Sequence, residues 1–131
     1  MATPSFIYRK ASLQDLWRET HPNSPAPAEL GQYTNWQCLF EAQVIGHCTG
    51  NCGTGEIIGL AVASTHRRHG IGKKLLSLVV EAIRAAGTTK IWLAASSDPA
   101  LPAFGFYRAV GWSPTGDRTG DGEEILEPRH N

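Results

Sequence analysis

The chain has 131 residues, of which 41% are hydrophobic and 18% are charged, the profile of an ordinary globular protein. This length supports one hydrophobic core, so we expect a single domain over residues 1–131. Its 12 Lys and Arg residues balance its 12 Asp and Glu residues, which argues against nucleic acid or a membrane surface as a partner.

The first residues lack the apolar stretch of a signal peptide, and no apolar run is long enough to span a membrane. The three cysteines are an odd number, so we expect reduced thiols in a cytoplasmic protein. His47, Cys48 and Cys52 are close in sequence, but a structural zinc site needs four ligands in paired spacing. No metal is therefore expected.

The N-terminal part predicts a strand, a helix and a loop. Residues 6–8 are apolar and suit a short strand, and Ser12 suits the cap of a helix over residues 13–20. Residues 21–29 are proline-rich and predict a loop, with a short helix at 28–33.

Three strands are predicted next. Residues 36–43 and 44–51 suit the two strands of a hairpin. Residues 56–64 are apolar at almost every position, which predicts a central strand covered on both faces. Gly59 inside this strand is a candidate bulge.

The second half alternates helices and strands. Residues 73–86 carry apolar side chains at three- and four-residue spacing and predict a helix. Residues 90–96 predict a buried strand parallel to the strand before that helix, with any ligand at the carboxyl ends of the two strands. A second helix is predicted over 100–110, and two strands joined by a Gly- and Asp-rich turn over 111–127.

The connection that leads into the long helix, residues 64–76 (STHRRHGIGKKLL), is rich in hydrogen-bond donors. Free N–H groups at a helix start favour an anion, and glycines at 70 and 72 let a phosphate approach the main chain. Four cations add charge for more than one phosphate: Arg67, Arg68, Lys73 and Lys74. The segment predicts a pyrophosphate site, against the alternative of a plain turn with a solvated basic face.

Two common phosphate motifs do not fit. A P-loop needs Gly where Arg67 stands and Ser or Thr where Lys74 stands. A dinucleotide fingerprint needs a small residue where Leu75 stands, and an acid about twenty residues later. Both readings therefore fail.

The remaining pattern, Arg67-x-x-Gly70-x-Gly72, resembles the acyl-CoA-binding motif of the GNAT superfamily of N-acyltransferases. Residues 103–112 (AFGFYRAVGW) are similar to that family's Ala-x-x-x-Tyr-x-x-x-Gly-aromatic segment, and residues 56–64 resemble its splayed central strand. The resemblance implies an α/β (α+β) fold with a mixed, mostly antiparallel central sheet. That sheet splays at a parallel strand pair and is flanked by helices.

The resemblance also implies acetyl-CoA as co-substrate. Its pantetheine arm would pair with Ala61 and Val62 of the central strand, and a backbone N–H near Val62 would stabilise the oxyanion. The implied cofactor-binding residues are Ala61, Val62, Arg67, Arg68, His69, Gly70, Ile71, Gly72 and Lys73.

The implied reaction is direct attack of an amine on the thioester, without a covalent enzyme intermediate. Tyr107 matches the family's general acid, and the alternative is a core tyrosine with a hydrogen-bonded hydroxyl. Glu56 lies eleven residues before Arg67, where some family members place their base. The alternative for Glu56 is a surface glutamate at a strand edge.

The expected function is N-acetylation of a primary amine on a small molecule or peptide, by a monomer or a homodimer. The alternative is a non-catalytic acetyl-CoA-binding sensor that regulates a partner protein. The acidic tail suits either a solvated hairpin or the attraction of a cationic amine. Its acidic residues are Asp117, Asp121, Glu123, Glu124 and Glu127.

Overall fold

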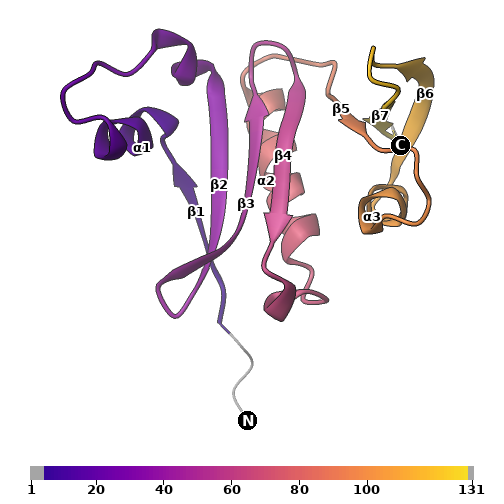
Figure 1. Cartoon of the computed structure of the whole chain (residues 1–131), viewed down its shortest axis with the longest axis horizontal. Coiled ribbons are helices and arrows are strands. Elements are labelled where there is room, and N and C mark those ends of the chain that lie inside the picture. Colours follow the sequence, from indigo (N-terminus) through magenta and orange to yellow (C-terminus); the bar gives the residue numbers. More distant parts are fainter. Residues whose placement is uncertain (1–4, 130–131) are drawn as a thin grey trace.

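The computed structural model describes residues 5–129, in which one sheet carries seven strands in the order β1-β2-β3-β4-β5-β7-β6 (Figure 1). The strands are β1 (Ile7–Ala11), β2 (Tyr33–Phe40), β3 (Gln43–Asn51), β4 (Glu56–Val62), β5 (Trp92–Ala95), β6 (Trp112–Arg118) and β7 (Glu124–Pro128). The helices are α1 (Leu13–Thr20), α2 (Ile71–Ala85) and α3 (Pro102–Ala109), with 3-10 turns η1 (Ala28–Gln32) and η2 (Ser64–His66).

The predicted element order is confirmed, and so is a mostly antiparallel sheet with one parallel pair, β4 and β5. Helix α1 has the predicted bounds because the Ser12 side chain accepts a hydrogen bond from the Asp15 N–H. Helix α2 begins at Ile71, earlier than predicted, because Gly70 precedes it in the left-handed conformation (φ 74°). Strand β1 extends to Ala11, since all five of its residues pair with β2.

The prediction that the central strand is covered on both faces is wrong. In β4, Ile57 is 4% exposed whereas Ile58 is 51% exposed. Ile57 packs beneath α2, since it lies beside Val79 and Ile83 around Gly50. Strand β3 pairs Thr49 with Gly59 and Gly50 with Ile57, so Ile58 is an extra residue. A β-bulge therefore lies next to Gly59.

The core lies between the sheet and one face of α2, where Figure 1 shows the helix running behind β3 and β4. Six α2 side chains are buried: Ile71, Leu75, Leu76, Val79, Val80 and Ile83. Gly50 on β3 makes this close approach possible, because a Cβ there would lie 2.6 Å from Val79 Cγ1 and 2.9 Å from Ile83 Cδ1.

We predict that Gly50→Ala lowers the free energy of unfolding by about 1–3 kcal/mol, since the added methyl overpacks the interface with α2. Urea unfolding measures the change. The matched control is Gly59→Ala on the neighbouring strand, where an added Cβ meets no atom within 4 Å. Equal stability of the two variants would contradict this packing account.

Candidate functional site

Strands β4 and β5 pair at Glu56–Trp92 and Ile57–Leu93 and then part. A cleft of about 390 Å³ opens where they separate, between the end of β4, the start of α2 and α3. Figure 1 shows that β4 and α3, which both line the cleft, lie apart in the fold. Its lining residues are Leu60, Ala61, Val62, His66, Arg67, Arg68, Ile71, Gly72, Pro102, Ala103, Phe106 and Tyr107.

One wall of the cleft is a free edge of the sheet. The N–H of Ala63 donates to Ile45 O on β3 (2.7 Å). Because successive residues of a strand point their polar groups to opposite sides, Val62 and Leu60 direct theirs toward the cleft. Within residues 5–129 no strand pairs with this edge beyond Ile57. The edge can therefore take the amides of an extended ligand.

The end of the cleft is the basic turn before α2. Gly70 and Arg68 both have left-handed backbones, with φ of 74° and 70°. Gly70 can adopt this conformation without strain, whereas the left-handed backbone of Arg68 costs about 1–2 kcal/mol of conformational free energy. The turn directs the first N–H groups of α2, with two arginines, toward the cleft, which suits an anionic group.

The structure brings most of the predicted cofactor-binding residues to this cleft: Ala61, Val62, Arg67, Arg68, Ile71 and Gly72. Ile71 is only 2% exposed, so its side chain belongs to the core beneath the cleft. His69 and Gly70 are exposed in the turn but do not line the cleft, and Lys73 lines a neighbouring groove with Arg84 and Arg129.

Gly72 has a packing role that the sequence did not indicate. A Cβ at Gly72 would lie 3.3 Å from the Phe106 ring and 3.7 Å from Val62 Cγ2. The absence of a side chain therefore lets Phe106 of α3 approach the first turn of α2. This contact closes the cleft between its two walls.

Four rings support the basic turn: Phe6, Phe40, His66 and His69, which we call the aromatic clamp. The Phe6 ring centroid lies 5.6 Å from Phe40 and 5.4 Å from His69, and Phe40 lies 5.0 Å from His66. Such tilted pairs are each worth about 0.5–1.5 kcal/mol. The clamp therefore offsets the strain at Arg68 and holds the turn in place.

Tyr107 projects from α3 into the far wall of the cleft. Burial raises the pKa of its phenol, and the neighbouring Cys48 thiol adds to the increase. Helix α3 is fixed by Arg108, which pairs with Glu124 of β7 (2.7 Å) and stacks on Phe104 (3.6 Å). A protonated phenol is thus held at the cleft on an anchored helix.

Glu56 begins β4 and does not line the cleft. Its side chain points away from α2, since the next residue, Ile57, packs toward that helix. Leu60, the first β4 residue of the cleft, is four residues along the strand, or about 13 Å. The structure therefore does not bring Glu56 and Tyr107 together.

Five lining residues were not predicted: Leu60, His66, Pro102, Ala103 and Phe106. Strand alternation carries a signal for Leu60, because it shares a side with Val62. Phe106 directly precedes Tyr107 in residues 103–112, the segment that resembles a family motif. Nothing in the sequence indicates that His66 would turn toward the cleft.

His47, Cys48 and Cys52 do not converge on a metal site. Among residues 5–129 no group of three or more His, Cys, Asp or Glu side chains could hold a metal ion. Over the same residues no helix has both the length and the apolar composition needed to cross a membrane.

We predict that Phe6→Ala loosens the basic turn and speeds tryptic cleavage after Arg67 and Arg68 by several-fold, because His69 loses its ring partner. Timed digestion read by mass spectrometry measures the rate. Ile7→Ala is the control, because Ile7 is next to Phe6 in the chain and is 63% exposed. Equal cleavage in both variants would show that the clamp does not hold the turn.

Comparisons with known proteins agree with this geometry. A model of the acetyltransferase (GNAT) family matches residues 6–112. No curated protein sequence gives a significant match. The chain is similar in structure to PaiA N-acetyltransferase from Thermoplasma acidophilum in complex with coenzyme A. The TM-score is 0.71 and the identity 16%, over 96% of this chain and 99% of that chain.

Two further structures are similar. A GNAT family acetyltransferase from Elizabethkingia anophelis with acetyl-CoA bound has a TM-score of 0.65 and 15% identity, covering 95% of this chain and 98% of that chain. An aminoglycoside 6′-N-acetyltransferase complexed with coenzyme A has a TM-score of 0.62 and 17% identity, covering 95% and 99%. These structural similarities establish the fold, and the family model covers most of the sequence. The chain belongs to the GNAT acetyltransferase family, whose co-substrate is acetyl-CoA.

Proposed function

We propose that this protein transfers an acetyl group from acetyl-CoA to a primary amine of a small molecule or peptide. The observation that carries the proposal is the free edge of β4, which ends at a left-handed, basic turn on the start of α2. An extended amide chain followed by a diphosphate matches these two features in the same order.

The donor would lie along β4. Leu60 and Val62 turn their backbone N–H and C=O groups to the cleft. The N–H of Leu60 and the C=O groups of both residues would pair with the amides of the pantetheine arm, which leaves the N–H of Val62 for the reacting carbonyl. The diphosphate would accept hydrogen bonds from the first N–H groups of α2 and from Arg67 and Arg68. Phe106 and Pro102 would cover the arm from the side of α3.

The acceptor amine must first lose a proton, which costs about 4 kcal/mol at neutral pH for an alkyl amine. Glu56 is the proposed base, and its distance from the cleft requires that water relay the proton. The amine nitrogen then attacks the thioester carbon, and the Val62 N–H stabilises the negative charge that forms on oxygen.

Collapse of the intermediate breaks the bond from carbon to sulfur, and the nitrogen releases its remaining extra proton to solvent, from which Tyr107 later regains its own. The electron pair stays on sulfur, and the Tyr107 phenol donates a proton to the leaving thiolate. Because burial raises the pKa of Tyr107, this proton remains in place at physiological pH. The products are the acetylated amine and free coenzyme A, with no covalent bond to the protein.

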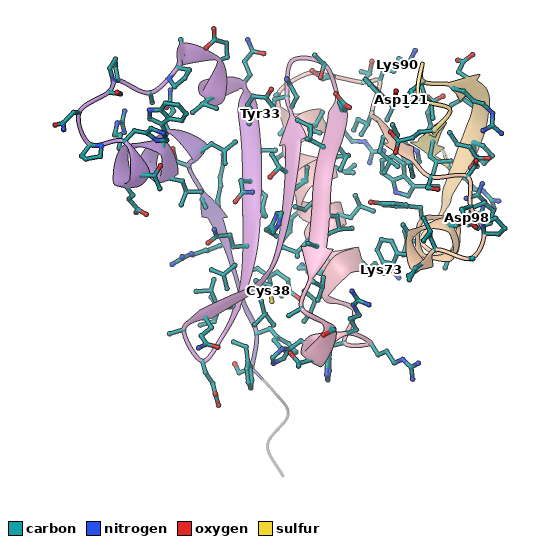
Figure 2. All side chains as sticks on the ribbon, in the orientation of Figure 1. Tyr33, Cys38, Lys73, Lys90, Asp98 and Asp121 are labelled. Atoms are coloured by element: carbon teal, nitrogen blue, oxygen red, sulfur yellow. The ribbon has the colours of Figure 1, made fainter. Side chains whose placement is uncertain are left out.

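Tyr107→Phe is predicted to lower kcat by roughly 10- to 100-fold with little change in the KM for acetyl-CoA, since the lost proton acts only on the leaving group. Tyr33→Phe is the control, because Tyr33 lies toward the end of the sheet opposite Lys73 (Figure 2). An unchanged kcat in Tyr107→Phe would remove this residue from the mechanism.

The pH profile tests the same assignment. The usual pKa of tyrosine is about 10, and the shift in the folded protein is upward. Tyr107 therefore stays a proton donor to beyond pH 10, and kcat should not fall between about pH 8 and 10. A fall in kcat within that window that Tyr107→Phe abolishes would contradict the raised pKa, because it would show that Tyr107 loses its proton below pH 10.

Release of free thiol from acetyl-CoA across a panel of polyamines, amino acids, aminoglycosides and peptides tests the activity itself. We expect release that depends on the amine. A sensor would instead be stabilised by acetyl-CoA in a thermal shift measurement while no amine accelerates thiol release. That result would replace the proposed activity with the regulatory alternative.

A further inference from the structure

One histidine stands beside the cleft on the open face of the sheet. His47 of β3 pairs with Ala61 of β4, and Ala61 lines the cleft. Gly46, the residue before His47, faces α2, since a Cβ there would lie 3.1 Å from Leu75 Cδ1. Because side chains alternate along a strand, His47 faces the other way, and it is exposed. In Figure 1 this is the face turned to the viewer, with α2 behind the sheet.

The two faces of the sheet differ in access at the end of β4. Val62 faces α2, because a Cβ at Gly72 would lie 3.7 Å from Val62 Cγ2. Phe106 of α3 contacts the same glycine, so α2 and α3 together cover this face. Ala61 points to the opposite face and is exposed. An amine can therefore reach a thioester on the edge of β4 from the face that carries Ala61 and His47.

Only a methyl group separates His47 from the cleft. Neighbouring strands are about 4.8 Å apart, so a ligand on the edge of β4 lies roughly 10 Å from the backbone of β3. An imidazole that leans over Ala61 spans about half of that distance, and one water molecule spans the rest. Glu56 shares this face, but it lies about 13 Å along β4 from Leu60. His47 is therefore the nearer of the two groups to the reacting position.

The groups that face His47 carry little charge. Strand β3 packs against β2, β4 and α2, and α2 is on the other face. The residues level with His47 are Gln37 on β2 and Ala61 on β4, and both are uncharged. The charged side chains on this face of β1 to β4 are Arg9, whose Nε donates to Gln37 Oε1 (3.0 Å), and Glu56. No ionisable group lies level with the His47 ring on either neighbouring strand.

The His47 ring is also free to exchange a proton. His21 and His66 hold their Nδ1 atoms against Thr20 Oγ1 (2.8 Å) and Thr65 Oγ1 (2.9 Å). Within residues 5–129 no protein group forms a hydrogen bond of this kind to His47. Imidazole is the side chain that gains and loses a proton near neutral pH, as a base acting on an ammonium group must.

We propose that His47 accepts the proton that the acceptor amine loses before it attacks. The inference rests on the proposed function and supplies the first acceptor in the water relay toward Glu56. The proton passes from the ammonium nitrogen through one water to a ring nitrogen of His47, and the electron pair left on nitrogen attacks the thioester carbon. The exposed imidazolium then returns the proton to solvent on the face where Glu56 also lies.

The first test varies the basicity of the amine in His47→Gln, which stays polar but cannot take up a proton. With ethylamine, which is protonated at neutral pH, we expect kcat/KM to fall by about 100-fold at pH 7. With 2,2,2-trifluoroethylamine the loss should stay within about threefold, because its fluorines withdraw electron density and leave most of the amine unprotonated. Equal loss with both amines would show a structural role, and no loss with ethylamine would show no role. Either result would overturn the proposal.

Chemical rescue tests the same step. Added imidazole should raise the ethylamine kcat/KM of His47→Ala by about tenfold, since the open face lets a free base occupy the vacated position. His21→Ala is the matched control, because it removes another exposed histidine from α1's end, outside the cleft. We expect the control to keep wild-type activity and to gain nothing from imidazole. Equal stimulation of the two variants would overturn the assignment.

NMR of the histidine rings separates this inference from the activity. If no amine promotes thiol release, the proposed function fails, and the position of His47 can still be judged. Saturation with acetyl-CoA should shift the His47 ring signals, identified by their loss in His47→Gln, and leave those of His21 in place. His47 signals that do not move, or that move no more than those of His21, would overturn the placement of this ring beside the thioester.

Discussion

The structure depends on one interruption in the backbone hydrogen bonding of the sheet. Strands β4 and β5 run parallel for only two residue pairs, and beyond Ile57 the edge of β4 has no strand partner among the described residues. Unpaired backbone amides are costly to bury, so this edge is stable only where a ligand or water reaches it. The cleft, the turn at its end and the tyrosine on its far wall are all arranged around that edge.

The surrounding packing fixes the two walls of the cleft relative to each other. Gly50 lets α2 lie against β3, and Gly72 lets Phe106 of α3 reach the first turn of α2. Arg108 fastens α3 to β7 through Glu124. The contact of α2 with β3 supports one wall of the cleft, and the pair of Arg108 and Glu124 supports the other. The contact of Phe106 with α2 closes the space between the walls.

The sequence predicted the elements well because their local signals agree with the tertiary contacts. Ser12 marked the start of α1, and the donor-rich glycine segment before α2 marked the basic turn. Exposure was harder to predict. The apolar run in β4 suggested two covered faces, yet Ile58 is half exposed, because a bulge and a single covering helix cannot be read from composition.

The site was predicted in part for similar reasons. Arg67, Arg68 and Tyr107 line the cleft, and their motifs are local in the sequence. Phe6, just before β1, and Phe40, at the end of β2, support the turn from distant parts of the chain, and no spacing rule connects them to His69 or His66. The packing role of Gly72 likewise arises from a contact between distant segments, α2 and α3.

The most direct measurement is a crystal structure of this protein with coenzyme A. The account predicts that the pantetheine amides hydrogen-bond to the backbone of Leu60 and Val62, that the diphosphate lies on the turn at residues 67–72, and that the sulfur approaches the Tyr107 hydroxyl. Coenzyme A bound elsewhere, with the edge of β4 left to water, would contradict it.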